Sequence, residues 1–196
     1  LEFEKEINAL GKFTGKKVKN KVFILGGQKI EDYFPLMDML KNKNNKILAA
    51  GVLANLFLVM KGHNLGYEEV WLRKNDYLKL IPKLKRIYNK YKNRIILPVD
   101  FGLINGKKRI GVLLKQAPYP YKIYDVGKET VKIFKENLSK TDYVFMKGPL
   151  GFSEIPAFST GTKDILEYIL HLTKNKKIFS VLGGGHLTTT IKKYKI

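Results

Sequence analysis

Three glycine-containing segments follow short apolar runs, and together they could bind an anionic ligand. The segments are Gly26-Gly27-Gln28-Lys29, Lys147-Gly148-Pro149-Leu150-Gly151 and Gly183-Gly184-Gly185-His186. Glycine has no Cβ, so its backbone can approach a phosphate closely, and the free N–H groups at a following helix start favour negative charge. We therefore expect all three segments to face one ligand.

A few polar side chains beside these segments could do chemistry. Lys29 directly follows two glycines and is a mobile cation suited to a phosphate. Glu154 is an acid in a Gly-Phe-Ser-Glu loop, and His186 follows three glycines at a predicted helix start. His63 is predicted to lie in a loop that ends a helix, and His171 is predicted to lie late in another helix. The three histidines therefore lack the spacing of a metal site.

Each glycine segment alone is a weak signal, because any tight turn from strand to helix favours glycine. The sequence contains neither a Gly-x-x-x-x-Gly-Lys-Ser/Thr loop nor a Gly-x-Gly-x-x-Gly loop. Neither of these two phosphate-binding motifs is therefore supported.

The elements that must position these residues alternate between strands and helices. Short apolar runs predict strands at 22–25, 46–51, 94–100, 143–146 and 179–182. Apolar periodicity predicts helices at 1–11, 33–40, 52–60, 77–91, 130–138 and 161–172, with a break at Pro82 in the fourth. Residues 102–122 are typical of a hairpin or an irregular surface segment, and 121–127 of a short strand or turn.

This alternation predicts an α/β fold with a mostly parallel, doubly wound sheet in three layers. Such a sheet binds ligands at the carboxyl ends of its strands, where the glycine segments lie.

Composition limits the classes of protein. The chain has 196 residues, no cysteine and a formal charge of +20. One domain without disulfides is therefore expected, and no apolar run approaches the ~20 residues of a membrane span. We therefore expect a cytoplasmic protein. The basic excess is nearly all lysine and is scattered along the chain, which disfavours dedicated nucleic-acid binding without excluding it.

The ordered set of motifs resembles the C-terminal, nucleotide-binding half of phosphoglycerate kinase. The segments that carry the resemblance are 25–30, 97–100, 124–127, 146–154, 158–162 and 182–186. The Gly-Gly-Gly-His form and Ala54-Asn55 are most similar to the archaeal branch. The resemblance implies a Rossmann-like domain at 16–196 that binds ADP or ATP with Mg²⁺, preceded by an interdomain helix remnant at 1–15.

The resemblance also implies roles for individual residues. Lys29 would contact the nucleotide phosphates and the phosphoryl group in transfer, and is the expected catalytic residue. Tyr124 would form an apolar wall for the adenine, and Glu154 would bind the ribose hydroxyls. His186 stands where most relatives have a magnesium-binding aspartate, so Mg²⁺ would arrive with the nucleotide. The other implied nucleotide-binding residues are Gly26, Gly27, Ala50, Gly51, Lys147, Pro149, Gly183, Gly184 and Gly185.

The sequence departs from the family at two positions and resembles only half of the enzyme. The family has asparagine where Lys147 stands and threonine where Leu187 stands. Its Ser-Thr-Gly-Gly-Gly turn would lie beyond Ile196, and its N-terminal 3-phosphoglycerate domain is not matched. The whole enzyme exchanges a phosphoryl group between 1,3-bisphosphoglycerate and ADP in glycolysis and gluconeogenesis.

We therefore expect this chain alone to be inactive and monomeric, and to need the N-terminal domain for 3-phosphoglycerate. A fragment of a longer enzyme and a reduced relative both stay open, as do two other functions. These are a non-catalytic ADP- or ATP-binding module and a basic nucleic-acid-binding protein.

Overall fold

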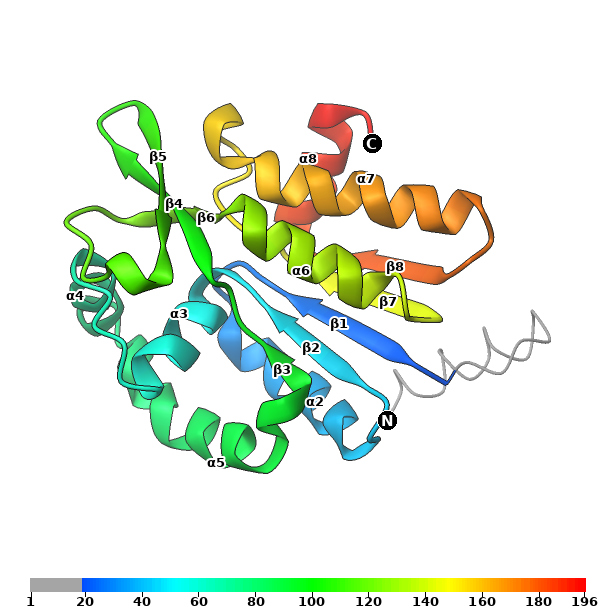
Figure 1. The fold of residues 1–196 in the computed structure, drawn as a ribbon, viewed down its shortest axis with the longest axis horizontal. Coiled ribbons are helices and arrows are strands. Elements are labelled where there is room, and N and C mark those ends of the chain that lie inside the picture. The colour runs from blue at the N-terminus through cyan, green and yellow to red at the C-terminus, as the bar shows by residue number, and fades with distance from the viewer. Residues whose placement is uncertain (1–18) are drawn as a thin grey trace.

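A five-stranded parallel sheet organises the part of the chain that the computed structural model describes, residues 19–196 (Figure 1). The strand order is β3-β2-β1-β7-β8. The strands are β1 (Lys21–Leu25), β2 (Lys46–Ala49), β3 (Ile95–Ile96), β7 (Tyr143–Lys147) and β8 (Phe179–Gly183). The predicted parallel sheet is confirmed.

Helices cover both faces of this sheet, so its strands are continuous apolar runs. Phe23 and Leu25 of β1 face one core, whereas Val22 and Ile24 face the other. The first core is covered by α2 (Phe34–Met37), α3 (Gly51–Met60) and α5 (Ile81–Tyr91). The second is covered by α6 (Lys128–Leu138), α7 (Thr160–Lys174) and α8 (Gly185–Tyr194). The predicted three-layer α/β fold is therefore confirmed.

A second, antiparallel sheet of three strands stands at one end of the first sheet (Figure 1). It consists of β4 (Asp100–Asn105), β5 (Lys108–Leu113) and β6 (Ile123–Val126), in the order β5-β4-β6. For 102–122 we expected a hairpin or an irregular segment. The structure has a hairpin of β4 and β5, which begins at Asp100. Phe101 and Leu103 pack with Leu58 of α3 in a third, smaller core.

The prediction of a single strand over 94–100 is wrong. The parallel strand β3 ends at Ile96, and Asp100 already belongs to β4 in the second sheet. Pro98 lies between the two strands and has no N–H group for a ladder hydrogen bond, so the chain leaves one sheet there and enters the other.

Prolines also shape the helices. The predicted helix at 33–40 is a series of short pieces, η1 (Ile30–Tyr33), α2 and η2 (Asp38–Lys41), with Pro35 in the first turn of α2. The break expected at Pro82 is confirmed, because η3 (Tyr77–Leu80) precedes α5.

One eight-residue helix, α4 (Tyr67–Lys74), was not predicted. Only Glu68 and Leu72 of α4 are buried, so it lacks a clear apolar stripe. Short turns of 3-10 helix complete the elements: η4 (Lys92–Arg94), η5 (Leu114–Gln116) and η6 (Pro156–Phe158). The helix expected at 1–11 lies outside the described residues. Within 19–196, no helix has the length and apolar character to cross a membrane.

Strand register brings the glycine segments to one edge of the parallel sheet. Leu25, the last residue of β1, pairs with Ala49 at the end of β2 and with Lys147 at the end of β7. Lys147 pairs in turn with Gly183 at the end of β8. From β1 the chain winds outward through β2 and β3, whereas β7 and β8 lie on the other side. The point where the winding changes direction is where open α/β sheets bind ligands.

Candidate functional site

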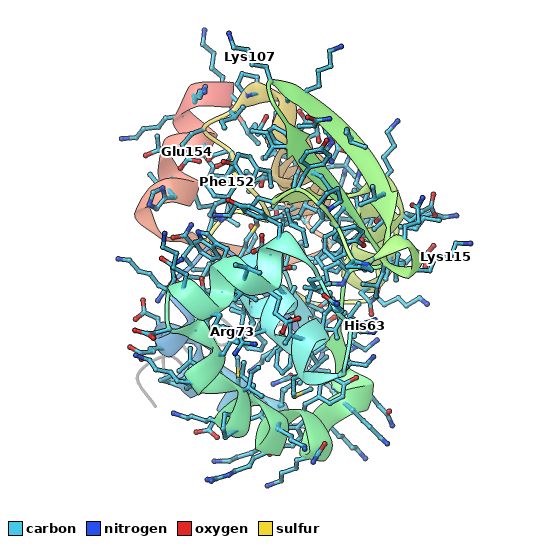
Figure 2. All side chains as sticks on the ribbon, turned by 90° about the vertical axis from the view of Figure 1, so that its left-hand side faces the viewer. His63, Arg73, Lys107, Lys115, Phe152 and Glu154 are labelled. Carbon is cyan, nitrogen blue, oxygen red and sulfur yellow. The ribbon has the colours of Figure 1, made fainter. Side chains whose placement is uncertain are left out.

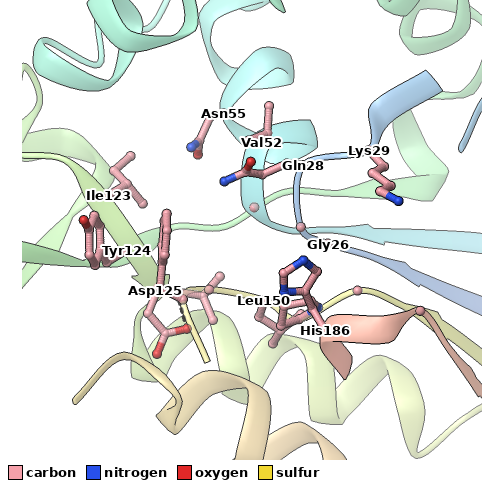
Figure 3. Close-up of a pocket in the computed structure, with 18 of the residues that line it drawn as sticks. Gly26, Gln28, Lys29, Val52, Asn55, Ile123, Tyr124, Asp125, Leu150 and His186 are labelled. Carbon is pink, nitrogen blue, oxygen red and sulfur yellow. Dashed lines mark hydrogen bonds between the residues drawn. The ribbon is translucent and has the colours of Figure 1, made fainter. Parts of the chain in front are cut away.

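A pocket of about 660 Å³ lies at this edge, and all three glycine segments line it (Figure 3). The start of α3, part of α4 and strand β6 form its opposite wall. Every nucleotide-binding residue expected from the sequence lines the pocket except Ala50 and Gly183. Ala50 is fully buried behind the surface, next to Gly51. His63 and His171 do not line it.

The glycines allow the turns to pack directly against one another. A Cβ on Gly26 would overlap the carbonyl oxygen of Pro149. Gly51 has a positive φ of +54°, and a Cβ there would lie 2.7 Å from the backbone nitrogen of Gly27. A Cβ on Gly185 would meet nothing within 4 Å, so the start of α8 stays open. Gly26 and Gly51 are thus required by contact between turns, whereas Gly185 leaves room for a ligand.

Gly51→Ala is expected to destabilise the fold by roughly 2 kcal/mol or more. The left-handed conformation costs a residue with a Cβ about 1–2 kcal/mol, and the contact with Gly27 adds to this. Urea unfolding of the variant measures the change. The control is Gly111→Ala in β5, where a Cβ meets nothing within 4 Å. Equal unfolding free energies for the two variants would contradict the assigned role of Gly51.

One end of the pocket carries exposed cations. Lys29 is exposed, and its ammonium group makes no hydrogen bond or ion pair with another residue in 19–196. The ammonium group of Lys147 lies 3.1 Å from the carboxylate of Asp32. The N-terminal turn of α8, which begins after Gly184, faces the same end. Lys29 is therefore free to meet an anion, whereas Lys147 must share its charge with Asp32.

Glu154 and His186 face each other across the rim of the pocket. His186 Nδ1 lies 2.8 Å from Glu154 Oε1, and both side chains are largely exposed to solvent. Glu154 and Phe152 lie on the same flank of the molecule, beside α8 (Figure 2). The second carboxylate oxygen of Glu154 has no partner among the described residues. It can accept a hydrogen bond from a ligand.

The two departures from the family pattern have different environments. Leu187 is fully buried in the core between the sheet and its helices, where it packs in one cluster with Met146. Leu187 therefore acts as a core residue of α8. Lys147, by contrast, lines the pocket and presents a cation to it.

The other end of the pocket is apolar and aromatic. The rings of Tyr124 and Phe152 are stacked, with centroids 4.1 Å apart and planes at 19°. Val52, Ile123 and Leu150 line the same region (Figure 3). A flat apolar group such as a nucleobase suits this end.

Sequence reasoning missed a buried polar group behind the apolar end. Glu68 is only 1% exposed. Its Oε1 accepts a hydrogen bond from Asn55 Nδ2 at 2.9 Å, and its Oε2 accepts one from the Ile123 N–H at 3.2 Å. Burial raises the pKa of Glu68 to about 7, although nearby Lys122 and the two hydrogen bonds oppose the shift. Glu68 and Glu69 are the same residue type at a helix start, so the sequence held no signal that only the first is buried.

A second buried acid supports the pocket wall from behind. Asp125 pairs with Arg109 at 2.8 Å and accepts a hydrogen bond from the Gly161 N–H at 3.0 Å. Burial raises the pKa of Asp125, and its hydrogen bonds and Arg109 oppose this. No arginine lines the pocket itself.

The described residues contain no group of three or more His, Cys, Asp or Glu side chains that could hold a metal ion. The carboxylates at the cation end, Asp32 and Glu154, are each engaged by a basic side chain. This donor set suits a Mg²⁺ ion that is held mainly by ligand phosphates.

The comparisons with known proteins all point to the same family. The sequence profile described as phosphoglycerate kinase matches residues 1–196. The chain is 37% identical over 197 residues to phosphoglycerate kinase from Methanothermus fervidus, covering 98% of this chain and 47% of that protein. It is 32% identical to the enzyme from Thermoplasma acidophilum, covering 97% of this chain and 47% of that protein. The chain thus spans about half the length of these curated relatives.

Solved structures agree with the sequence relatives. The crystal structure of phosphoglycerate kinase from Pyrococcus horikoshii matches with a TM-score of 0.84 and 31% identity, covering 97% of this chain and 48% of that chain. The phosphoglycerate kinase from Coxiella burnetii matches with a TM-score of 0.77 and 22% identity, over 96% of this chain and 49% of that chain. The second likeness concerns the fold alone.

Proposed function

Because the chain belongs to the phosphoglycerate kinase family, we propose that its pocket binds ADP or ATP with Mg²⁺. In this proposal the chain is the nucleotide-binding half of an enzyme that exchanges a phosphoryl group between 1,3-bisphosphoglycerate and ADP. The observation that carries the proposal is a single pocket with a free lysine at one end and stacked aromatic rings at the other.

The proposed orientation follows from the two ends of the pocket. The base lies at the apolar end near Tyr124, and the phosphates extend toward Lys29 and the start of α8. The N–H groups at a helix start and a free ammonium group both stabilise negative charge. Glu154 lies at the rim, where its free oxygen accepts hydrogen bonds from the ribose hydroxyls.

Mg²⁺ enters with the nucleotide in this proposal, and it supplies neutralisation of charge on the phosphates. Asp32 beside Lys147 is the pocket carboxylate that would hold it, because the free oxygen of Glu154 is assigned to the ribose. Lys29, placed at the end of the phosphate chain, would stabilise the charge that the phosphoryl group carries during transfer. Chemistry of this kind depends on positioning and charge stabilisation rather than on an acid–base pair.

The alternatives from the sequence have weaker support. A non-catalytic module that only binds nucleotide shares the same site, and Lys147 in place of the family asparagine favours it. Nucleic-acid binding has no residue-level observation in its favour, and Lys107 and Lys115 project into solvent at separate edges of the molecule (Figure 2). A cytoplasmic location and a monomeric state stay predictions.

Variants of Lys29 and Glu154 separate the two ends of the site. Lys29→Ala is expected to weaken ATP binding by about 10–100-fold and to leave adenosine unchanged, because the lost interaction is with phosphate. Glu154→Ala is expected to weaken adenosine and ATP by the same factor, because both carry the ribose. Isothermal titration calorimetry measures the four affinities.

The matched control for Lys29 is Lys115→Ala, which removes an equal charge from an exposed lysine that does not line the pocket. Its ATP affinity should equal that of the wild type. If Lys29→Ala weakened adenosine as much as ATP, the proposed orientation of the nucleotide would be wrong.

A further inference from the structure

Asn55 is a buried amide that faces the apolar end of the pocket. It lies on α3, is only 3% exposed, and lines the pocket beside Val52 (Figure 3). Its Nδ2 donates to Glu68 Oε1 at 2.9 Å. No residue in 19–196 donates a hydrogen bond to its Oδ1. Because Asn55 lines the pocket and only its Nδ2 is engaged by Glu68, Oδ1 can accept a hydrogen bond from a ligand.

Glu68 fixes the direction of this amide. A carboxylate can only accept hydrogen bonds, and Glu68 Oε2 already accepts the backbone N–H of Ile123 at 3.2 Å. Oε1 therefore requires a donor from Asn55, and the amide must turn its Nδ2 toward Glu68. Its Oδ1 is left for the pocket. The acceptor that the pocket presents is thus determined by a residue behind the wall.

We propose that Asn55, oriented by Glu68, makes the pocket select a base that carries an exocyclic amino group, adenine, over a base with a keto group at the same position. The proposal rests on the proposed nucleotide-binding function. The amino group of adenine donates to Asn55 Oδ1. A 6-keto purine places a second acceptor there, and two buried acceptors then lack a donor.

A purely structural role for the same hydrogen bond makes a different prediction. Asn55 and Glu68 also tie α3 to α4 and to β6. If this were their only effect, changing either residue would alter the binding of every nucleotide equally. The readout that separates the two roles is the ratio of affinities for ADP and inosine diphosphate. The two bases differ at C6, where a keto group replaces the amino group, and at the adjacent N1, which carries a hydrogen in the keto base.

The first test compares the two nucleotides with the unchanged chain at pH 8, above the pKa of about 7 for Glu68. ADP is expected to bind at least tenfold more tightly than inosine diphosphate. Asn55→Leu should remove this preference and bring the ratio close to one, because leucine keeps the volume and offers no acceptor.

The second test reverses the preference. In Glu68→Gln, the side-chain oxygen accepts the Ile123 N–H, and the new NH₂ group faces Asn55. The Asn55 amide then turns over and presents Nδ2 to the pocket. A donor suits the 6-keto group, so inosine diphosphate is expected to bind more tightly than ADP. Glu69→Gln is the matched control, because Glu69 lies next to Glu68 in the first turn of α4 and does not line the pocket.

The outcomes distinguish this inference from the proposed function. If neither nucleotide binds the unchanged chain, the proposed function fails and the inference fails with it. If both bind with equal affinity, the proposed function stands and the inference is overturned. A preference for ADP that survives both Asn55→Leu and Glu68→Gln would also overturn it, since the discrimination would then arise elsewhere.

Discussion

The 196-residue chain on its own is expected to give no detectable phosphoryl transfer from 1,3-bisphosphoglycerate to ADP. Transfer requires the donor and acceptor oxygens in line and shielded from water, which closure of a cleft between two domains provides. The donor, 1,3-bisphosphoglycerate, carries two phosphate groups, which several cations must hold. No arginine lines the pocket, and Lys147 there is already paired with Asp32.

A coupled assay of ATP formation with the purified chain measures this. Kinases turn over at about 1–100 per second, so the expected loss is at least ~10³-fold. The same preparation must bind MgADP, which excludes an unfolded sample as the cause. Turnover within the ordinary range would contradict the expectation and would mean that part of the basic surface binds 1,3-bisphosphoglycerate.

Glu68→Gln is expected to abolish a large part of the pH dependence of stability. Burial raises the pKa of Glu68 from 4.5 to about 7, so the folded chain binds this proton more tightly than the unfolded chain. Stability from this group is therefore full below pH 4.5 and is lost as the pH rises through 7. Between pH 5 and pH 8 the loss is roughly 2–3 kcal/mol, which glutamine cannot show.

Urea unfolding at pH 5 and pH 8 measures this difference for the wild type and the variant. Glu69→Gln is again the control, because Glu69 is partly exposed and pairs with Arg73 on the surface. The unfolding free energy of Glu69→Gln should change between the two pH values as much as that of the wild type. A wild-type stability that changes no more than that of Glu68→Gln between the two pH values would show that Glu68 titrates normally in the folded chain.

The sheet and one side of the pocket could be predicted from the sequence, since they depend on local patterns. Each core strand is a short apolar run that ends in a glycine turn, as at Leu25 and Gly26. Because the strands are parallel, their carboxyl ends lie at one edge of the sheet, and this can be predicted without knowing any long-range contact. The positions of Lys29 and Glu154 on the pocket wall follow from this rule.

The opposite wall could not be predicted, because it depends on contacts between distant segments. Asn55 meets Glu68 from another helix, and Glu68 meets Ile123 across 55 residues of sequence. Helix α4 has no apolar periodicity that would reveal the buried face of Glu68. The burial of Leu187 could not be predicted for the same reason, because it depends on how α8 packs on the sheet.

Thermal unfolding of the chain with increasing MgADP tests the central claim most directly. A ligand that binds only the folded state stabilises it by about 2.7 kcal/mol at 100 times its dissociation constant. For a chain of this size, the account predicts a rise in melting temperature of roughly 5–10 °C at that concentration, and a smaller rise for Lys29→Ala. An unchanged melting temperature at millimolar MgADP would contradict the account.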